Sequence, residues 1–322
     1  MAVYTDITDQ ELESLLAGYD LGRALSCKGV AEGIENSNFI LDTEGGRFVL
    51  TIYERRVRAD DLPYFIDLMR WLAARDFPCP TPIADREGKV LTEVRGKPTA
   101  IVSFLSGLSV RRPTQAQSRE VGKGLARLHA AAAGFPGRRP NALGLAAWAP
   151  LFTPRQAAAA AKLEAGLDQR IADDLDALAA AWPADLPTGP IHADLFPDNA
   201  FFDRDRFVGA IDFYFACDDA LAYDLAVCLN AWCFEREGRL LAGHARALLE
   251  GYEALRPLQV NERAALPLLA RGAAMRFFLT RLVDWERGAE GALVTPKDPM
   301  EYARRLDVHR TGDLSAALGD LA

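Results

Sequence analysis

His192-Ala193-Asp194-Leu195-Phe196-Pro197-Asp198-Asn199 is a polar loop between apolar segments of the sequence, and Asp212 follows it at the end of the apolar run 207–211. Apolar residues precede the loop, and a polar turn at 203–206 separates two short apolar segments. This pattern predicts strands on both sides of the turn. Chemically reactive side chains on a loop that rigid strands hold point to a functional site.

Phosphoryl transfer to an alcohol accounts for the residue types in this loop. The reaction requires a carboxylate that accepts the hydroxyl proton and oxygen ligands that hold Mg²⁺ on the phosphates. We expect Asp194 to accept the proton, and Asn199 and Asp212 to bind the metal. The Asp-x-x-x-x-Asn spacing and the later Asp match the kinase catalytic and Mg²⁺ loops. His192 is the second expected catalytic residue, as one that orients the loop rather than as a base.

The alternative for any one of these residues is a turn cap, because Asp and Asn often bond to nearby backbone groups. The combined pattern is more specific than any single residue, and it favours phosphate transfer.

Composition excludes several classes of protein. The 322 residues, half of them hydrophobic and a quarter charged, suit a globular protein of one large domain or two packed lobes. The net charge of −8 argues against a nucleic-acid partner. No apolar stretch is long enough for a membrane span, and no signal-peptide pattern opens the chain. The five cysteines form no C-x-x-C pair, so we expect buried thiols in a reducing cytoplasm.

Hydrophobic patterning predicts two regions of different character. Before residue 106 it predicts strands within 24–53 with a hairpin turn at 42–46, a helix at 61–75, and strands at 90–94 and 99–105. After residue 106 it predicts helices, interrupted by a β segment at 189–213. The longest predicted helix covers about 264–287. Possible capping boxes at Thr8–Glu11 and Thr114–Gln117 mark two helix starts.

We therefore expect an α+β chain of two lobes. Residues 1–105 form a small antiparallel-sheet lobe with one long helix, and residues 106–322 form a larger, mainly helical lobe that carries the polar loop.

The polar loop resembles that of the aminoglycoside-phosphotransferase and choline-kinase branch of the protein-kinase-like fold. Within this branch the sequence is similar to the homoserine kinases of that type. The matching stretches are 33–39, 48–54, 191–202, 211–217, 231–235 and 271–285. The resemblance implies a nucleotide-binding first lobe and a catalytic second lobe, with ATP and Mg²⁺ as cofactors. It also implies transfer of the γ-phosphate to the hydroxyl of L-homoserine, a step towards threonine.

Two unrelated phosphate-binding loops are absent from the sequence. It contains no Gly-x₄-Gly-Lys-Ser/Thr loop. It also lacks the Gly-Leu-Gly-Ser-Ser loop of the other kind of homoserine kinase.

The first lobe carries the residues expected at the nucleotide. Small and polar residues between the first two strands can bring backbone N–H groups to phosphates, although an ordinary turn looks the same. Thr51 stands where this fold usually has a phosphate-binding lysine, so Lys28 or Arg47 supplies the charge or Mg²⁺ carries more of it. The backbone at 103–105 is expected at the adenine. The full set is Gly33, Asn36, Ser37, Asn38, Thr51, Ser103 and Leu105.

The acceptor residues are expected in the second lobe. Homoserine is a zwitterion, so its carboxylate suits an arginine fork and its ammonium suits a carboxylate. Arg276 and Arg281 lie within an apolar helix, with a structural ion pair as the alternative role. Tyr214 and Asp218 follow Asp212 closely along the chain. These four residues are the expected substrate contacts.

Two further residues of the second lobe have expected structural roles. Asp224 is expected to anchor the catalytic loop or to cap a helix, and His129 is expected to be structural.

Two alternatives remain open at the level of sequence. One is a related kinase that acts on choline, methylthioribose or an aminoglycoside. The other is a catalytically inactive ATP-binding module, which the absence of a lysine at Thr51 keeps open.

Overall fold

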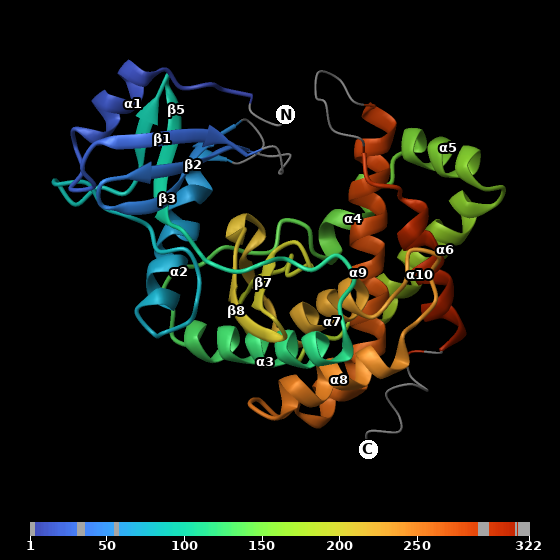
Figure 1. Cartoon of the computed structure of the whole chain (residues 1–322). Helices are drawn as coiled ribbons and strands as arrows, with labels where there is room; N and C mark the ends of the chain where they lie inside the picture. Colours follow the sequence, from blue (N-terminus) through green and yellow to red (C-terminus); the bar gives the residue numbers. More distant parts are fainter. Residues whose placement is uncertain (1–3, 31–35, 55–57, 289–295, 313, 315–322) are drawn as a thin grey trace. The chain divides into compact units, whose positions relative to one another are not determined.

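The computed structural model describes residues 4–30, 36–54, 58–288, 296–312 and 314. Contacts divide the chain after Ser106 into two compact units, shown in Figure 1. The predicted capping boxes at Thr8–Glu11 and Thr114–Gln117 are both present. Among the described helices, none is long and apolar enough to cross a membrane.

The first unit is built on a five-stranded antiparallel sheet in the order β1-β2-β3-β5-β4. The predicted hairpin is confirmed, since β2 and β3 pair over their whole length. The elements are α1 (Asp9–Leu16), β1 (Ala24–Gly29), β2 (Asn36–Thr43), β3 (Gly46–Tyr53), the short 3₁₀ turn Ala59–Asp61, α2 (Leu62–Ala73), β4 (Thr92–Val94) and β5 (Lys97–Ser103).

One face of this sheet forms an apolar core with α1. Successive residues of a strand point to opposite faces, and paired residues on neighbouring strands share a face. The buried core residues of the α1 face include Leu12, Leu16, Phe39, Leu41, Leu50, Ile52 and Ile101. The opposite face therefore carries Asn38, its partner Thr51 and the partner of Thr51, Ala100.

The second unit is mainly helical, as predicted. Two small antiparallel sheets, β6–β9 and β7–β8, interrupt the helices. The elements are α3 (Gln115–Ala132), α4 (Leu145–Leu151), α5 (Pro154–Leu163), α6 (Leu167–Ala181), β6 (Thr188–Ile191), β7 (Ala200–Asp203), β8 (Arg206–Ala210), the 3₁₀ turn Phe213–Phe215, β9 (Cys217–Ala220), α7 (Leu221–Trp232), α8 (Ala242–Glu253), α9 (Val260–Arg287) and α10 (Met300–Thr311).

Close helix packing in this unit depends on glycine. A Cβ on Gly122 of α3 would collide with the carbonyl of Leu248 in α8, and a Cβ on Gly251 of α8 would collide with the carbonyl of Arg119. Helix α7 is buried along almost its whole length and lies beside the long helix α9 (Figure 1). The polar loop follows β6 and packs against both helices, since Asp224 of α7 and Arg276 of α9 bond to its backbone.

Candidate active site

The polar loop joins β6 to β7, and buried side chains hold its backbone. The N–H groups of His192 and Ala193 donate to the two carboxylate oxygens of Asp224, at 2.7 and 2.8 Å. Further along, the Trp232 indole Nε1 donates to the Leu195 carbonyl at 2.8 Å. Both anchors belong to α7, so one buried helix fixes the start and the middle of the loop.

Asp224 is fully buried and is the main anchor of the loop. Burial opposes its ionisation, but hydrogen bonds from His129 and from the His192 backbone outweigh this, so the pKa of Asp224 is lowered. The His129 Nε2 lies 3.1 Å from Asp224, and its Nδ1 lies 2.7 Å from the Tyr252 hydroxyl. The expected anchoring role of Asp224 and the structural role of His129 are confirmed.

His192 uses both ring nitrogens within the loop. Its Nε2 lies 2.9 Å from the Ile211 carbonyl and must donate, while its Nδ1 accepts the Asp194 N–H at 3.2 Å. Burial lowers the pKa of His192, so the ring is neutral. This geometry corresponds to a residue that orients the loop, and it leaves the ring no nitrogen with which to accept a substrate proton.

Asp194 is half-buried, with part of its carboxylate tied to the loop. The Asn199 amide Nδ2 donates to the Asp194 carbonyl at 2.8 Å and to its Oδ2 at 3.2 Å. Oδ1 accepts no hydrogen bond from the described residues. Burial raises the pKa of Asp194 well above its usual range, and the charge of Arg276 opposes this rise. A carboxylate with a raised pKa and a vacant oxygen suits a proton acceptor.

Asn199 and Asp212 lie on the two sides of the β7–β8 hairpin, and their segments are joined by a hydrogen bond. The Ile211 N–H donates to the Asn199 carbonyl at 3.0 Å. Since the Asn199 amide nitrogen points to Asp194, its Oδ1 is left as an oxygen donor. Asp212 has a left-handed backbone with φ of +66°. One carboxylate and one amide oxygen fit a Mg²⁺ site that substrate phosphates and water complete.

Two of the expected substrate contacts follow Asp212. Tyr214 lies in the 3₁₀ turn and is half-buried. Asp218 lies in β9, where its Oδ2 accepts the Arg139 backbone N–H at 2.7 Å and its Oδ1 lies 3.3 Å from the Arg138 guanidinium. Asp218 therefore holds the 138–140 segment against β9.

The two arginines of α9 have different surroundings. Arg281 donates to Glu301 at 2.7 Å and to the Asp298 carbonyl at 3.1 Å, and it stacks on Tyr302. This guanidinium joins α9 to α10, which differs from the substrate role expected from the sequence and agrees with the structural alternative. Arg276 is buried beneath the loop and donates to the Ala193 carbonyl.

In the first unit, the residues expected at the nucleotide divide between the two faces of the sheet. Ser37 lies on the α1 face, where its hydroxyl accepts the N–H groups of Tyr4 and Thr5 and donates to Glu54. It holds the N-terminal segment, contrary to the expected phosphate contact. Asn36 and Asn38 point to the opposite face, and the Thr51 hydroxyl donates to Asn38 Oδ1 at 2.8 Å.

The remaining nucleotide residues have mixed outcomes. Gly33 lies outside the described residues. The Ser103 N–H donates to the Thr81 carbonyl, so this N–H is not available to adenine, and the Ser103 hydroxyl accepts the Thr81 N–H. Leu105 makes no backbone hydrogen bond with the described residues.

Strand register helps to choose between the two candidate cations, Lys28 and Arg47, that could replace the usual lysine. Lys28 pairs with Ile40, which shares the face of Asn38 and Thr51, and its side chain is exposed. Arg47 lies on the same face, but it is bonded to Asp42 at 2.6 and 3.2 Å. Of the two candidates, Lys28 is the one without a carboxylate partner among the described residues.

Sequence reasoning missed an ion pair between Lys97 and Glu54 at the end of this sheet. Lys97 follows the register of Val94 onto the α1 face, and it also contacts the Thr5 hydroxyl. The pair therefore lies on the face opposite Thr51 and fastens the N-terminal segment. No local signal identifies it, because Glu54 follows β3 whereas Lys97 opens β5, and the two residues are 43 positions apart in the sequence.

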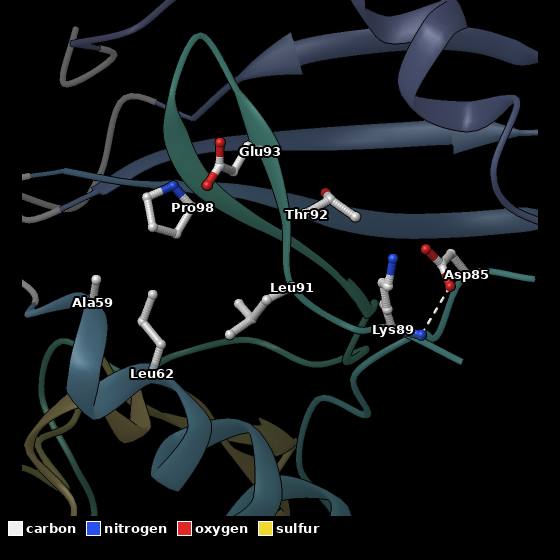
Figure 2. A pocket seen from close by; sticks show the side chains of 8 residues that line it. All are labelled: Ala59, Leu62, Asp85, Lys89, Leu91, Thr92, Glu93 and Pro98. Carbon is white, nitrogen blue, oxygen red and sulfur yellow. Dashed lines mark hydrogen bonds between the residues drawn. The ribbon is translucent and has the colours of Figure 1, made fainter. Parts of the chain in front are cut away.

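A separate hollow of about 440 Å³ lies in the first unit. Figure 2 shows that side chains from the 3₁₀ turn and the start of α2, from residues 85–91 and from the β4–β5 hairpin line it. The Lys89 backbone N–H donates to Asp85 Oδ1. The exposed ammonium of Lys89 is paired with Glu87 at 2.8 Å. None of the expected site residues lines this hollow.

Comparison with known proteins places the whole arrangement in a family. Residues 26–258 match the model of the phosphotransferase enzyme family. The chain belongs to this family. The matched segment of this phosphotransferase includes the entire loop from His192 to Asp212 and the anchor Asp224.

The relatives of this phosphotransferase share almost its full length. It is 62% identical to homoserine kinase of Caulobacter vibrioides, over 97% of the chain and 98% of that protein. It is 64% identical to homoserine kinase of Phenylobacterium zucineum, over 97% and 96%.

Solved structures confirm the fold class expected from the sequence. An amicoumacin kinase in complex with AMP-PNP and Ca²⁺ superimposes with a TM-score of 0.70, 15% identity and 98% coverage of both chains. A choline kinase from Cryptosporidium parvum gives a TM-score of 0.66, with 14% identity and 96% coverage of both chains. The expected protein-kinase-like fold of aminoglycoside and choline kinases is confirmed.

Proposed function

We propose that this phosphotransferase is a homoserine kinase, which transfers the γ-phosphate of ATP to the hydroxyl of L-homoserine and yields O-phospho-L-homoserine for threonine biosynthesis. The observation that carries the acceptor is identity of 62–64% to homoserine kinases over almost the whole of both chains. The loop geometry supports the reaction type, since its residues match the needs of phosphate transfer to an alcohol.

In the proposed mechanism, Asp194 Oδ1 accepts the hydroxyl proton of homoserine as the hydroxyl oxygen bonds to the γ-phosphorus. The β–γ bridging oxygen leaves with ADP. The raised pKa of Asp194 favours proton transfer, and its hydrogen bond from Asn199 holds the carboxylate in one orientation. Asp224 contributes by fixing the backbone before Asp194, and the His192 ring contributes by accepting the Asp194 N–H.

We propose Mg²⁺ as the resident metal, held by Asn199 Oδ1 and the Asp212 carboxylate. When bound, it neutralises charge on the β- and γ-phosphates. Two oxygen donors from the protein suit this ion, which usually keeps waters and substrate phosphates among its ligands.

The other proposed contacts involve the two substrates separately. For ATP they are the backbone of Leu105 at adenine, and Asn36, Asn38 and Lys28 near the phosphates. For homoserine they are Tyr214 and Asp218. The five cysteines are free thiols, which suits the reducing cytoplasm where we place the reaction.

A panel of alcohols tests the proposed acceptor. Purified enzyme with ATP and Mg²⁺ is given L-homoserine, choline, methylthioribose or an aminoglycoside, and ADP release is measured. We expect kcat/KM for L-homoserine to exceed that for each other alcohol by at least about 100-fold, because buried polar groups reject a poorly matched acceptor. No ADP release with homoserine, combined with release for another alcohol, would reject the acceptor and keep the reaction. Mn²⁺, Ca²⁺ and Mg²⁺ compared in the same assay test the metal.

A further inference from the structure

Arg276 is a buried guanidinium in contact with the catalytic loop. It lies on α9 with 2% of its surface exposed, and its Nη1 donates to the Ala193 carbonyl at 2.6 Å. The guanidinium stacks on the rings of Phe277 and Phe215, at 4.6 and 5.5 Å from their centroids. Its Nε has no hydrogen-bond partner in the described part of the chain.

The charge of Arg276 lacks the compensation that a buried arginine usually has. No carboxylate of the described residues lies within ion-pair distance of it. Removing a guanidinium from water without a paired carboxylate is unfavourable, so such a residue is retained where its charge or its donors have a use. Its hydrogen bond to the loop ends on the residue before Asp194.

Ala193 has the backbone conformation that this hydrogen bond stabilises. Its φ is +62°, a left-handed value that residues other than glycine, asparagine and aspartate rarely adopt. The surroundings determine this conformation from two sides, since its N–H donates to Asp224 and its carbonyl accepts from Arg276. The direction of the Asp194 side chain depends on this turn, because Asp194 is the next residue.

We propose that Arg276 is a positioning residue for phosphate transfer, which acts through the Ala193 carbonyl to hold Asp194 in place and does not bind the homoserine carboxylate. This inference rests on the proposed function only in taking homoserine as the acceptor. It replaces the substrate contact that the sequence alone suggests for Arg276. A positioning residue affects kcat, whereas a residue that binds the acceptor carboxylate mainly affects KM and the dissociation constant.

The test compares three variants with the wild-type enzyme. Arg276→Met keeps the apolar stem between the two rings and removes the donor, and Arg276→Lys restores a charge and a donor. Arg305→Met is the matched control, because Arg305 is also buried and also stacks on two rings, Tyr302 and Phe234, but donates no hydrogen bond to the loop among the described residues. Steady-state kinetics with L-homoserine and calorimetric binding of L-homoserine are measured for each variant.

We expect Arg276→Met to lower kcat by about 100-fold, the effect of a small displacement of a catalytic group, with KM and the dissociation constant for homoserine within about threefold of wild type. Arg276→Lys recovers part of kcat, and Arg305→Met keeps kcat within about threefold. An increase of KM and of the dissociation constant above about 30-fold with unchanged kcat would overturn the proposal, as would unchanged kcat in Arg276→Met or equal losses in Arg305→Met.

A second variant and a second substrate cover two cases in which the first comparison gives no result. If Arg276→Met does not fold, Arg276→Lys is judged by the same division between kcat and KM. If the wild-type enzyme prefers another alcohol, the same measurements are made with that alcohol. The acceptor is then wrong, while the role of Arg276 is still tested.

Discussion

The polar loop of the second unit and the sheet face that carries Thr51 in the first unit differ in how their charged and polar groups are held. Around the loop, buried side chains bond to the backbone of residue after residue, and Asp224 and Arg276 hold Ala193 from both sides. On the sheet face, the position expected to carry a lysine is Thr51, whose hydroxyl is bonded to Asn38.

The difference indicates where this enzyme needs precision. The proposed proton transfer requires Asp194 in one orientation, which a buried framework can provide. Coulomb attraction to the phosphates acts over longer distances than a hydrogen bond. A cation such as Lys28 or the metal can therefore neutralise phosphate charge without one exact position. The predictions below test the two regions in turn.

The metal side of the loop should show the largest effect. Replacing Asp212 by Asn removes the carboxylate of the proposed Mg²⁺ site, and we expect kcat to fall by about 1000-fold or more, since a metal contributes several kcal/mol to the transition state. Kinetics at varied Mg²⁺ measure the loss. Asp205→Asn in the exposed β7–β8 turn is the control. Full activity of the Asp212 variant would mean that this carboxylate is not a metal ligand.

The anchor of the loop should affect stability as well as rate. Asp224→Ala leaves the N–H groups of His192 and Ala193 buried without an acceptor, and we expect a loss of about 3–5 kcal/mol in the free energy of unfolding. Urea denaturation measures it. Asp176→Ala on an exposed face of α6 should change stability by less than about 0.5 kcal/mol. Equal losses in the two variants would contradict the anchoring role.

On the sheet face, the effect should be smaller and confined to the nucleotide. Lys28→Ala removes a cation of the Thr51 face that makes no ion pair among the described residues, and we expect KM for ATP to rise by about tenfold with kcat almost unchanged, as for one lost charge-assisted contact. Lys89→Ala, paired with Glu87 at the surface, is the control. If KM for ATP is the same in the two variants, the metal neutralises the phosphate charge without Lys28.

The smallest effect is expected at the pair of Lys97 and Glu54. Because this pair lies on the α1 face and is partly exposed, Lys97→Met should cost about 1 kcal/mol or less and leave KM for ATP unchanged. Thermal unfolding and ATP kinetics on the same preparation separate the two quantities. A large rise in KM would show that Lys97, rather than Lys28, replaces the missing lysine.

Local features of the site could be predicted from the sequence. The spacing of Asp194, Asn199 and Asp212 follows from one short segment, and the hairpin and both capping boxes are equally local. The long helix α9 was expected within a few residues of its observed start.

Contacts between distant segments could not be predicted. The hydrogen bond from Arg276 to Ala193 spans 83 residues, and Arg281 reaches Glu301 on another helix. The orientation of Ser37 depends on which face of the sheet α1 covers, which the alternation of β2 alone does not indicate. Strand β9 contains two aspartates and was not expected to pair with β6, because acidic residues are depleted in strands.

The central claim is that Asp194 accepts the proton of homoserine, and the rate of Asp194→Asn tests it most directly. Conversion of L-homoserine and ATP to a phosphomonoester is followed by ³¹P NMR for the wild type, for Asp194→Asn, and for Asp198→Asn, whose exposed carboxylate lies 3.8 Å from Lys297. We predict that Asp194→Asn lowers kcat by about 1000-fold with an unchanged KM and melting temperature, while Asp198→Asn stays within about threefold. A rate for Asp194→Asn within threefold of wild type would contradict the account.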